Sequence, residues 1–425
     1  MIKKSIVVTG IFIVSTCIQL LSQIAVTKIF GAQLDLDIFL AAVSVPTIIV
    51  TVIYGTLNQA FLPLLGEQKA IHREDADSYF FSHLLVFGVI SIVISLILSL
   101  LAVPISALLY ASRGSEFVQN VATQMSFLLY ALPLGVVATM LGTYLYVHKN
   151  FYRFPLAQAV GSIINLAIIL LLHKQYGIWS LVIGFSVGIF AQILVVIPAS
   201  IGRLKLKLTS PLPLLLAWIP LIVGSFAVKS DMLIIRSFGS QLPTGYLVYL
   251  NLISKIFSIA AGVMTVGIQI VYLPHLVEQI ASKKFKQSIA SVNQAKLYAI
   301  VVSILVVIAV WIVSPFVIPI LFVGGKFSES DAQTTISLLP LFVLPAVGWG
   351  ISSIFFQPLL VLKKYLVLGS LNVSSLVMAW IVAIVVNQYY DPLVAISSGL
   401  ITLLSIGVIG SEIIWRHYRK TLLLS

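Results

Sequence analysis

The chain has 425 residues, of which 60% are apolar and only 9% are charged, and its mean hydropathy is +1.12. A soluble domain carries about 25% charged residues, so this composition excludes a water-exposed globular protein and indicates a chain that crosses a membrane many times. The formal net charge of +12 does not indicate nucleic-acid binding, because the basic residues gather at one side of the predicted spans.

Twelve apolar segments are each long enough to cross about 30 Å of hydrocarbon as a helix. We predict helices over about 5–30, 36–65, 79–110, 119–147, 155–173, 178–200, 212–238, 245–275, 289–322, 331–360, 365–388 and 392–415. The Met1-Ile-Lys-Lys start leads into a segment too long for the apolar region of a signal peptide, so we expect it to be retained as the first span. The connections are short, and we expect no soluble domain. Gly184 and Gly188, four residues apart, predict a close helix contact.

Lysine and arginine are distributed unevenly along the chain. With both termini in the cytoplasm, 18 of them lie at cytoplasmic ends and loops, and four lie in outer loops: Arg113, Lys174, Arg236 and Lys326. This bias predicts a multi-pass protein of the bacterial inner membrane with both termini in the cytoplasm. The basic loops also favour contact with anionic membrane lipids.

Two pairs of similar segments indicate an internal repeat. "LPLLGEQ" (Leu62–Gln68) and "LPHLVEQ" (Leu273–Gln279) agree at five of seven positions, and "KIFGAQL" (Lys28–Leu34) corresponds to "RSFGSQL" (Arg236–Leu242). Six crossings separate the copies, so both copies face the same way. We therefore predict an all-α polytopic membrane protein of about 12 transmembrane helices, arranged as two pseudo-symmetric six-helix lobes, 1–205 and 206–425, around a central cavity.

Polar residues inside the predicted spans need partners or water, because a charge at the centre of a bilayer costs about 2.5–3.5 kcal/mol. They lie on the first two helices of each lobe, and Asn251, Ser254 and Lys255 share one helical stripe. We interpret them as the lining of a hydrophilic cavity: Gln19, Gln23, Lys28, Asn58, Lys229, Asp231, Arg236, Asn251, Ser254 and Lys255. Two alternatives remain open: Asp231 forms a structural ion pair with Lys229 or Arg236, and Lys28 and Arg236 extend to the outer membrane surface.

Motifs of enzymatic chemistry are absent from the sequence. It has no G-x-x-x-x-G-K-[ST] phosphate-binding loop, its six histidines show no metal-ligand spacing, and Cys17 is its single cysteine. We expect no enzyme activity, no cofactor and no metal site. A coupling ion stays open, and Asp231 is the carboxylate best placed to bind one.

The segment "TKIFGAQLDLDIFLAAVSVPTIIVTVIYGTLNQAFLPLLGEQK" (Thr27–Lys69) resembles the MurJ/MviN lipid II flippases of the multidrug/oligosaccharidyl-lipid/polysaccharide (MOP) exporter superfamily. The resemblance adds Asp37, at the start of the second helix, to the candidate cavity residues. It also implies two arginines and an aspartate on helix 1 and an arginine on helix 2, but here those positions correspond to Thr16, Ser22, Gln23 and Val50. The family usually has fourteen helices, two more than we predict here.

The resemblance and the polar stripes together predict a flippase. It would move a lipid-linked oligosaccharide or peptidoglycan precursor, a lipid II-like polyprenyl-pyrophosphate sugar, from the inner to the outer leaflet by alternating access. Alternatives are a flippase for polysaccharide repeat units of the O-antigen or capsule type, a drug or cation antiporter of the MATE kind, and a non-transporting scaffold for envelope assembly. The expected partners are the lipid-linked glycan, membrane lipids and cell-envelope assembly proteins, and we expect a monomer.

Overall fold

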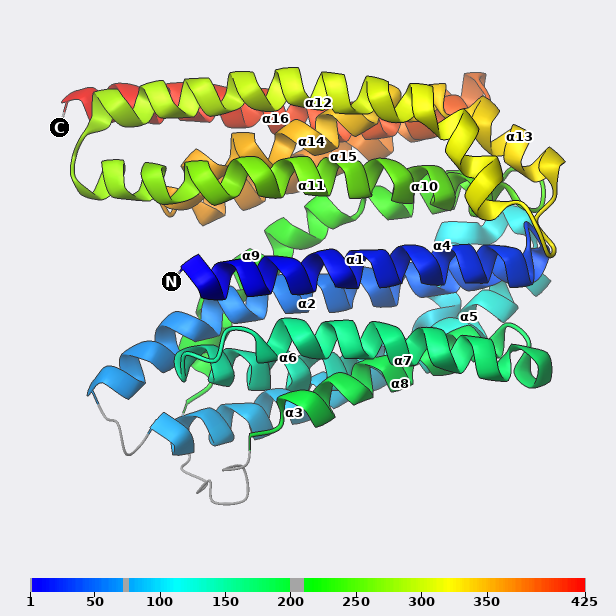
Figure 1. Ribbon diagram of the computed structural model, residues 1–425, viewed down its shortest axis with the longest axis horizontal. Coiled ribbons are helices and arrows are strands. Elements are labelled where there is room, and N and C mark those ends of the chain that lie inside the picture. Colours follow the sequence, from blue (N-terminus) through cyan, green and yellow to red (C-terminus); the bar gives the residue numbers. More distant parts are fainter. Residues whose placement is uncertain (1, 72–75, 199–209, 425) are drawn as a thin grey trace. The chain divides into compact units, whose positions relative to one another are not determined.

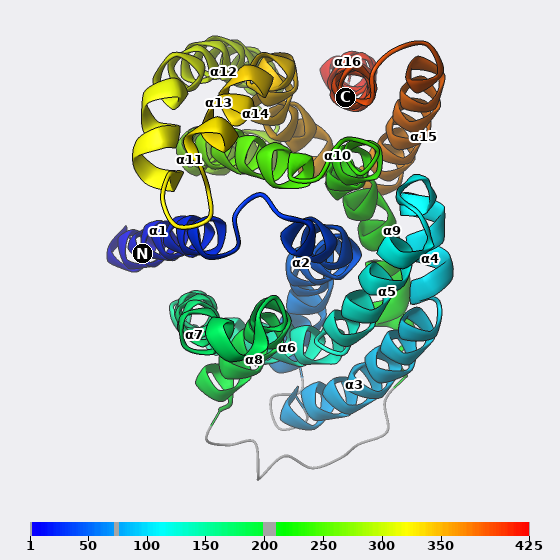
Figure 2. The same cartoon turned by 90° about the vertical axis from the view of Figure 1, so that its right-hand side faces the viewer.

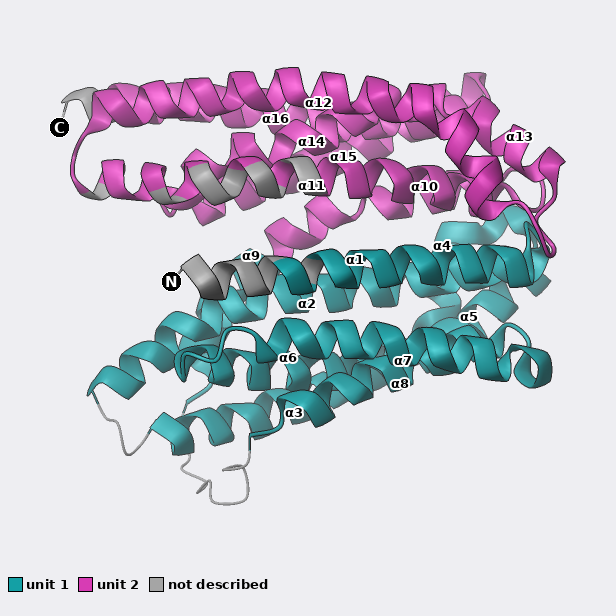
Figure 3. Ribbon diagram, viewed as in Figure 1, with its two compact units in different colours: residues 1–222 teal, residues 223–425 magenta. Residues whose placement is uncertain are grey.

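The computed structural model describes residues 2–71, 76–198 and 210–424, and nearly all of them are helical. Figure 1 shows the helices coloured along the chain. Packing divides the chain into two compact units, Met1–Ile222 and Val223–Ser425 (Figure 3). The lobes predicted from the repeat, 1–205 and 206–425, stay a prediction, because the units are defined by packing and not by the repeat.

Unit 1 contains eight helices, a 3₁₀ turn and the first part of a ninth helix. They are α1 (Ile2–Phe30), α2 (Leu34–Ile71), α3 (Ala76–Leu100), α4 (Ala102–Tyr110), the turn Ala111–Arg113, α5 (Ser115–Leu129), α6 (Leu132–Val147), α7 (Arg153–Tyr176), α8 (Trp179–Val196) and α9 (Leu212–Lys229).

Unit 2 begins within α9. It continues with α10 (Asp231–Gly239), α11 (Tyr246–Ala281), α12 (Phe285–Phe322), α13 (Glu329–Leu338), α14 (Pro340–Val361), α15 (Tyr365–Tyr389) and α16 (Pro392–Leu424).

The two units use the same helix pairs. In unit 1, α2 packs on α5 and α6, and α8 packs on α6 and α7; in unit 2, α11 packs on α13 and α14, and α16 packs on α14 and α15. Figure 2 shows α7 beside α8 and α15 beside α16. This agreement confirms the predicted fold class of duplicated helical lobes.

Among the described residues, eleven helical segments are long and apolar enough to cross a membrane, and α11 adds the shorter apolar segment Tyr246–Gly262. These segments match the twelve predicted spans one for one. The prediction differs from the structure within four of them, which are interrupted at Leu101, at Tyr130–Ala131, at Ser230 and at Leu339.

Proline explains three of the four interruptions. Pro104, Pro133 and Pro340 each lie in the first turn of the helix that follows the break. A proline has no backbone N–H to donate, so it is tolerated in a first turn and ends the preceding hydrogen-bond ladder. No proline lies beside Ser230, whose hydroxyl donates to the carbonyl of Phe226 at 2.7 Å.

A group of charges lies inside unit 2. Lys296 Nζ on α12 donates to Glu412 Oε2 on α16 at 2.6 Å, and Arg416 Nε donates to Glu412 Oε1 at 2.7 Å. The lysine ammonium also lies 4.9 Å from the ring centroid of Phe355 and 5.6 Å from that of Trp415. Carboxylate and aromatic rings together compensate the buried ammonium and fasten α12 to α14 and α16.

Glycines bring α7 and α8 into backbone contact. A Cβ atom on Gly188 would lie 2.8 Å from the carbonyl oxygen of Gly161, and a Cβ on Gly161 would lie 2.6 Å from that of Gly188. Gly184, the other member of the predicted pair, lies against Asn165 in the same interface. The predicted close contact is therefore confirmed, with Gly161 as its third member.

We expect Gly188→Ala to lower the thermal unfolding temperature, because a methyl group there must push two backbones apart at a cost of about 1–3 kcal/mol. Gly88→Ala on α3 is the matched control, since a Cβ at Gly88 meets no atom within 4 Å. The measurement is thermal unfolding of the purified protein in detergent. Equal unfolding temperatures for the two variants would contradict the packing described here.

Candidate functional site

The break at Ser230 places a carboxylate at the start of a helix. Asp231 is the first residue of α10, and its Oδ1 accepts the backbone N–H of Met232 at 2.9 Å. A negative charge is favoured at a helix N-terminus by the unpaired backbone N–H groups there. Lys229, one residue before the break, is exposed and interacts electrostatically with Asp231, and the indole of Trp349 also lies near the carboxylate.

One turn further along α10, Arg236 is only 5% exposed. Its Nη2 donates to Asn251 Oδ1 on α11 at 3.1 Å. The side chain therefore lies against the neighbouring helix. A buried guanidinium has five donors in a planar fork, a geometry suited to phosphate and carboxylate groups.

The polar stripe of α11 carries a second cation. Leu252, Ile253 and Phe257 are buried in unit 2, whereas Asn251, Ser254 and Lys255 are partly exposed on the other side of the helix. The Ser254 hydroxyl donates to the carbonyl of Leu250 at 2.7 Å, within its own helix. Lys255 is close enough to Arg236 for the two charges to interact. Unit 2 thus brings together Arg236, Asn251 and Lys255, which we call the α10–α11 cation group.

The predicted residues of α1 and α2 lie in unit 1. On α1, Gln19 is exposed, Lys28 is partly buried, and Gln23 Nε2 donates to Thr27 Oγ1 at 3.4 Å. On α2, Asn58 Oδ1 accepts from the Thr143 hydroxyl of α6 at 3.1 Å. Asn58 therefore helps to join two helices of unit 1, and Gln19 offers an accessible amide.

Asp37 differs from these residues because it is fully buried and has a cationic partner. Arg113 Nη2 lies 3.4 Å from its Oδ2 and joins the start of α2 to the turn before α5. Unit 2 repeats this link without a charge pair, since the Tyr249 hydroxyl donates to Asp331 Oδ1 at 2.6 Å and so joins α11 to α13. In each repeat a polar contact thus joins the start of the second predicted span (α2 or α11) to the beginning of the fourth (the turn before α5, or α13).

Sequence reasoning missed Arg113, which was counted only as an outer-loop charge. The signal was Asp37 itself, because a carboxylate inside an apolar helix needs a cation within reach. The nearest arginine on the same side of the membrane was the candidate.

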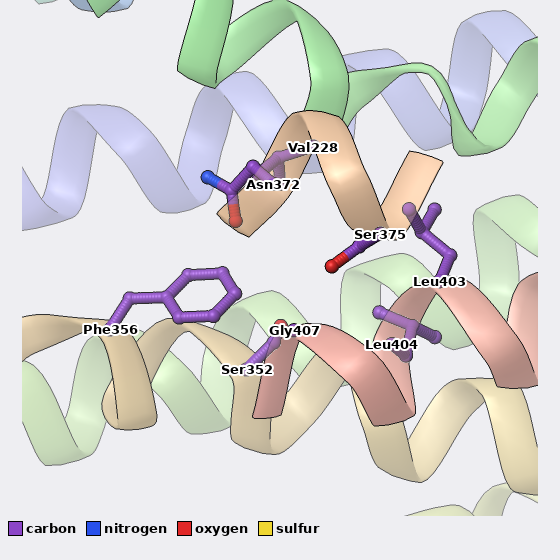
Figure 4. A pocket seen from close by; sticks show the side chains of 8 residues that line it. All are labelled: Val228, Ser352, Phe356, Asn372, Ser375, Leu403, Leu404 and Gly407. Carbon is purple, nitrogen blue, oxygen red and sulfur yellow. The ribbon is translucent and has the colours of Figure 1, made fainter. Parts of the chain in front are cut away.

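A small pocket lies beside Val228 in unit 2. Figure 4 shows Asn372 and Ser375 of α15 pointing into it, with Phe356, Leu403 and Leu404 around them. Its volume is about 20 Å³, which suits a single water molecule and excludes a sugar head group. Among the described residues, no group of three or more His, Cys, Asp or Glu side chains is placed to hold a metal ion.

The duplicated helical fold and the polar groups within its spans define a class of protein. Two duplicated helical units, with cations and amides held inside apolar spans, are the architecture of a multi-pass membrane transporter. A family model described as "Lipid II flippase MurJ" matches residues 26–405. The chain belongs to the MurJ family of lipid II flippases and is a multi-pass protein of the bacterial inner membrane.

Individual proteins agree with this assignment. The "Probable lipid II flippase MurJ" of Borreliella burgdorferi is 26% identical over 377 residues, which cover 84% of this chain and 72% of that protein. A solved structure of a lipid II flippase MurJ in an inward closed conformation matches with a TM-score of 0.83 at 19% identity, covering 97% of this chain and 87% of that one. An inward-facing MATE multidrug transporter of the MOP superfamily matches with a TM-score of 0.76 at 14% identity, covering 97% and 96%. The two structures show that the fold is shared.

We expect Asp37→Asn to destabilise unit 1, because it leaves the Arg113 guanidinium without its carboxylate. Breaking a buried pair on one side costs about 3–5 kcal/mol. Asp35→Asn is the control, since Asp35 is exposed two residues earlier in the same helix turn. Thermal unfolding of the purified variants checks the difference, and an Asp37→Asn protein as stable as Asp35→Asn would refute the role of the pair.

Proposed function

We propose that this protein is a flippase that carries the head group of a lipid-linked, pyrophosphate-bearing sugar from the inner to the outer leaflet. The observation that carries the proposal is the α10–α11 cation group, Arg236, Asn251 and Lys255, inside a chain of the flippase family. Pyrophosphate and sugar hydroxyls cannot enter hydrocarbon without polar partners. Two cations with an amide beside them supply such partners for the anionic part of the head group.

The mechanism we propose is alternating access. The head group passes along the polar residues of the duplicated hairpins, while the polyprenyl tail stays in the bilayer. Lys229 and Lys28 supply further positive charge along this path, and Gln19 and Gln23 supply neutral hydrogen-bonding groups. Asp231, held at the N-terminus of α10, is the group we assign to a coupling ion if one is exchanged.

The charge balance distinguishes this cargo from that of a drug or cation antiporter. An organic cation needs carboxylates, and the candidate path carries Asp231 against Lys229, Arg236 and Lys255. Asp37 adds no available charge, since its carboxylate is paired with Arg113. An anionic cargo is therefore favoured. A polysaccharide repeat unit on the same type of carrier fits the same charges, and a panel of lipid-linked sugars separates it from a peptidoglycan precursor.

The orientation and assembly state belong to the same proposal. The excess of lysine and arginine in the loops of one side supports an orientation with both termini in the cytoplasm. We propose that a single chain carries out transport. Flipping by the purified protein alone would exclude a role limited to scaffolding of envelope-assembly proteins.

We expect Lys255→Ala and Lys229→Ala each to slow flipping of a polyprenyl-pyrophosphate sugar about tenfold to a hundredfold. This range corresponds to the roughly 1.5–3 kcal/mol of a hydrogen bond to a charged group. The measurement is the rate of transfer between leaflets in proteoliposomes. Lys255→Arg should keep most of the activity, and Lys174→Ala, which removes an exposed charge at the end of α7, is the control. Wild-type rates in both alanine variants would refute the proposal.

We also expect an inside-negative potential to speed outward flipping of this anionic lipid. Two charges moving across 100 mV gain about 4–5 kcal/mol, since one charge gains about 2.3 kcal/mol. Potassium-diffusion potentials of either sign, imposed on the same proteoliposomes, check this expectation. A rate that is independent of the sign of the potential would show that the head group crosses without net charge movement.

A further inference from the structure

A second, larger pocket lies in unit 2, between α11 and α12. Its volume is about 320 Å³, at the lower end of the roughly 300–1,000 Å³ of small-molecule sites. The polar side chains that line it come from facing stripes of the two helices: Tyr272, His275 and Gln279 of α11, and Ser291, Gln294 and Tyr298 of α12. None of them belongs to the α10–α11 cation group. We call this space the hairpin pocket.

The lengths of the helices place the hairpin pocket at the level of the lipid head groups. α11 has 36 residues and α12 has 38, so each is about 54–57 Å long, against about 30 Å of hydrocarbon. The polar pocket residues lie in about the last three turns of α11, before its end at Ala281, and in about the first four turns of α12, after its start at Phe285. The pocket therefore lies at the end of the hairpin that is next to the turn joining the two helices. That turn carries Lys283 and Lys284 and is cytoplasmic in the proposed orientation.

The chemistry of the lining is neutral and rich in hydrogen-bonding groups. Gln294 Nε2 donates to the Tyr298 hydroxyl at 3.1 Å. Among the described residues, the Tyr272 hydroxyl and Gln279 Oε1 are buried and have no hydrogen-bond partner. Buried polar atoms of this kind normally have a protein, water or ligand partner. Hydroxyls, amides and aromatic rings without a charged side chain match a polyhydroxyl group better than a phosphate.

The internal repeat supplies a comparison for Tyr272. Tyr272 directly precedes the segment Leu273–Gln279, as Phe61 directly precedes the similar segment Leu62–Gln68. In unit 1, Phe61 is fully buried and stacks on Tyr79 and Phe80, with ring centroids 6.4 Å and 6.3 Å away. The equivalent place in unit 2 has a tyrosine beside open space. The fold therefore does not require a pocket at this position, and the C-terminal repeat has one.

We infer that the hairpin pocket binds a sugar ring of the lipid-linked glycan on the cytoplasmic side, before the head group moves to the α10–α11 cation group. This inference rests on the proposed function and adds an entry site to it. The shared ligand chemistry is a polyhydroxyl group at the membrane surface, which a glycerol-bearing phospholipid also offers. The sugar is favoured because the pocket has room for a ring and the phosphates can reach Lys283 and Lys284 at the turn.

The test uses the full chain in phosphatidylcholine nanodiscs and measures lipid binding by native mass spectrometry. The probes are a polyprenyl-pyrophosphate N-acetylhexosamine, the same polyprenyl pyrophosphate without sugar, and phosphatidylglycerol. We expect wild type to prefer the sugar-bearing lipid over the sugar-free one. Tyr272→Phe should lower this preference about threefold to tenfold, the effect of one lost hydrogen bond. Ser291→Trp should abolish it by filling the pocket.

Leu297→Trp is the control, because Leu297 lies on the same helix, is 59% exposed and does not line the pocket. If Ser291→Trp fails to fold, Tyr272→Phe decides, since it only restores the residue type of the other repeat. An unchanged sugar preference in Tyr272→Phe, or equal binding of phosphatidylglycerol, overturns the inference. If wild type still flips the lipid in that case, the proposed function stands. If wild type binds no lipid-linked sugar at all, both are rejected.

Discussion

The cost of holding a charged or amide group among apolar helices is the constraint on which this structure depends. Every such group inside a span must find a partner in protein or water, because hydrocarbon offers none. Asp37 is held by Arg113, Lys296 is held by Glu412 together with two aromatic rings, and Arg236 is held by Asn251. In each of the first two pairs a cation and a carboxylate of the same unit compensate each other's charge. Arg236 donates to a neutral amide, Asn251, and lies near a second cation, Lys255.

Because the chain contains two repeats, each feature of one unit can be compared with the equivalent place in the other. The two repeats use the same helix pairs, so a feature found in both units is explained by the fold, and a feature found in one has another cause. The contact between the second predicted span and the beginning of the fourth occurs in both units, as Asp37–Arg113 and as Tyr249–Asp331. The cations of α10 and α11, and the pocket beside Tyr272, belong to the second repeat. In the repeat, Arg236 of α10 corresponds to Lys28 of α1, whereas the place of Tyr272 is taken in unit 1 by Phe61 in a packed aromatic cluster.

How much of the structure could be predicted from the sequence depends on how far apart along the chain the interacting residues lie. Hydropathy acts over whole segments, so it placed all twelve spans, and two pairs of similar segments indicated the repeat. The breaks after Leu100, Leu129 and Leu338 were open to prediction, since Pro104, Pro133 and Pro340 mark them; the break at Ser230 depends on a serine that bonds its own helix. Partners across the fold were harder to find. Arg113 lies 76 residues from Asp37, and Lys296 lies 116 from Glu412, so only the need of a buried charge for a counter-charge pointed to them.

The arrangement of cations also bears on the departures from the family pattern. The resemblance places three arginines and an aspartate on the first two helices of the family, where this chain has Thr16, Ser22, Gln23 and Val50. A head group with two phosphates still needs positive charge once it leaves water, and on this chain Arg236 and Lys255 of the second repeat, with Lys229 nearby, can supply it. On the proposed function, unit 2 would supply the positive charge for the phosphates.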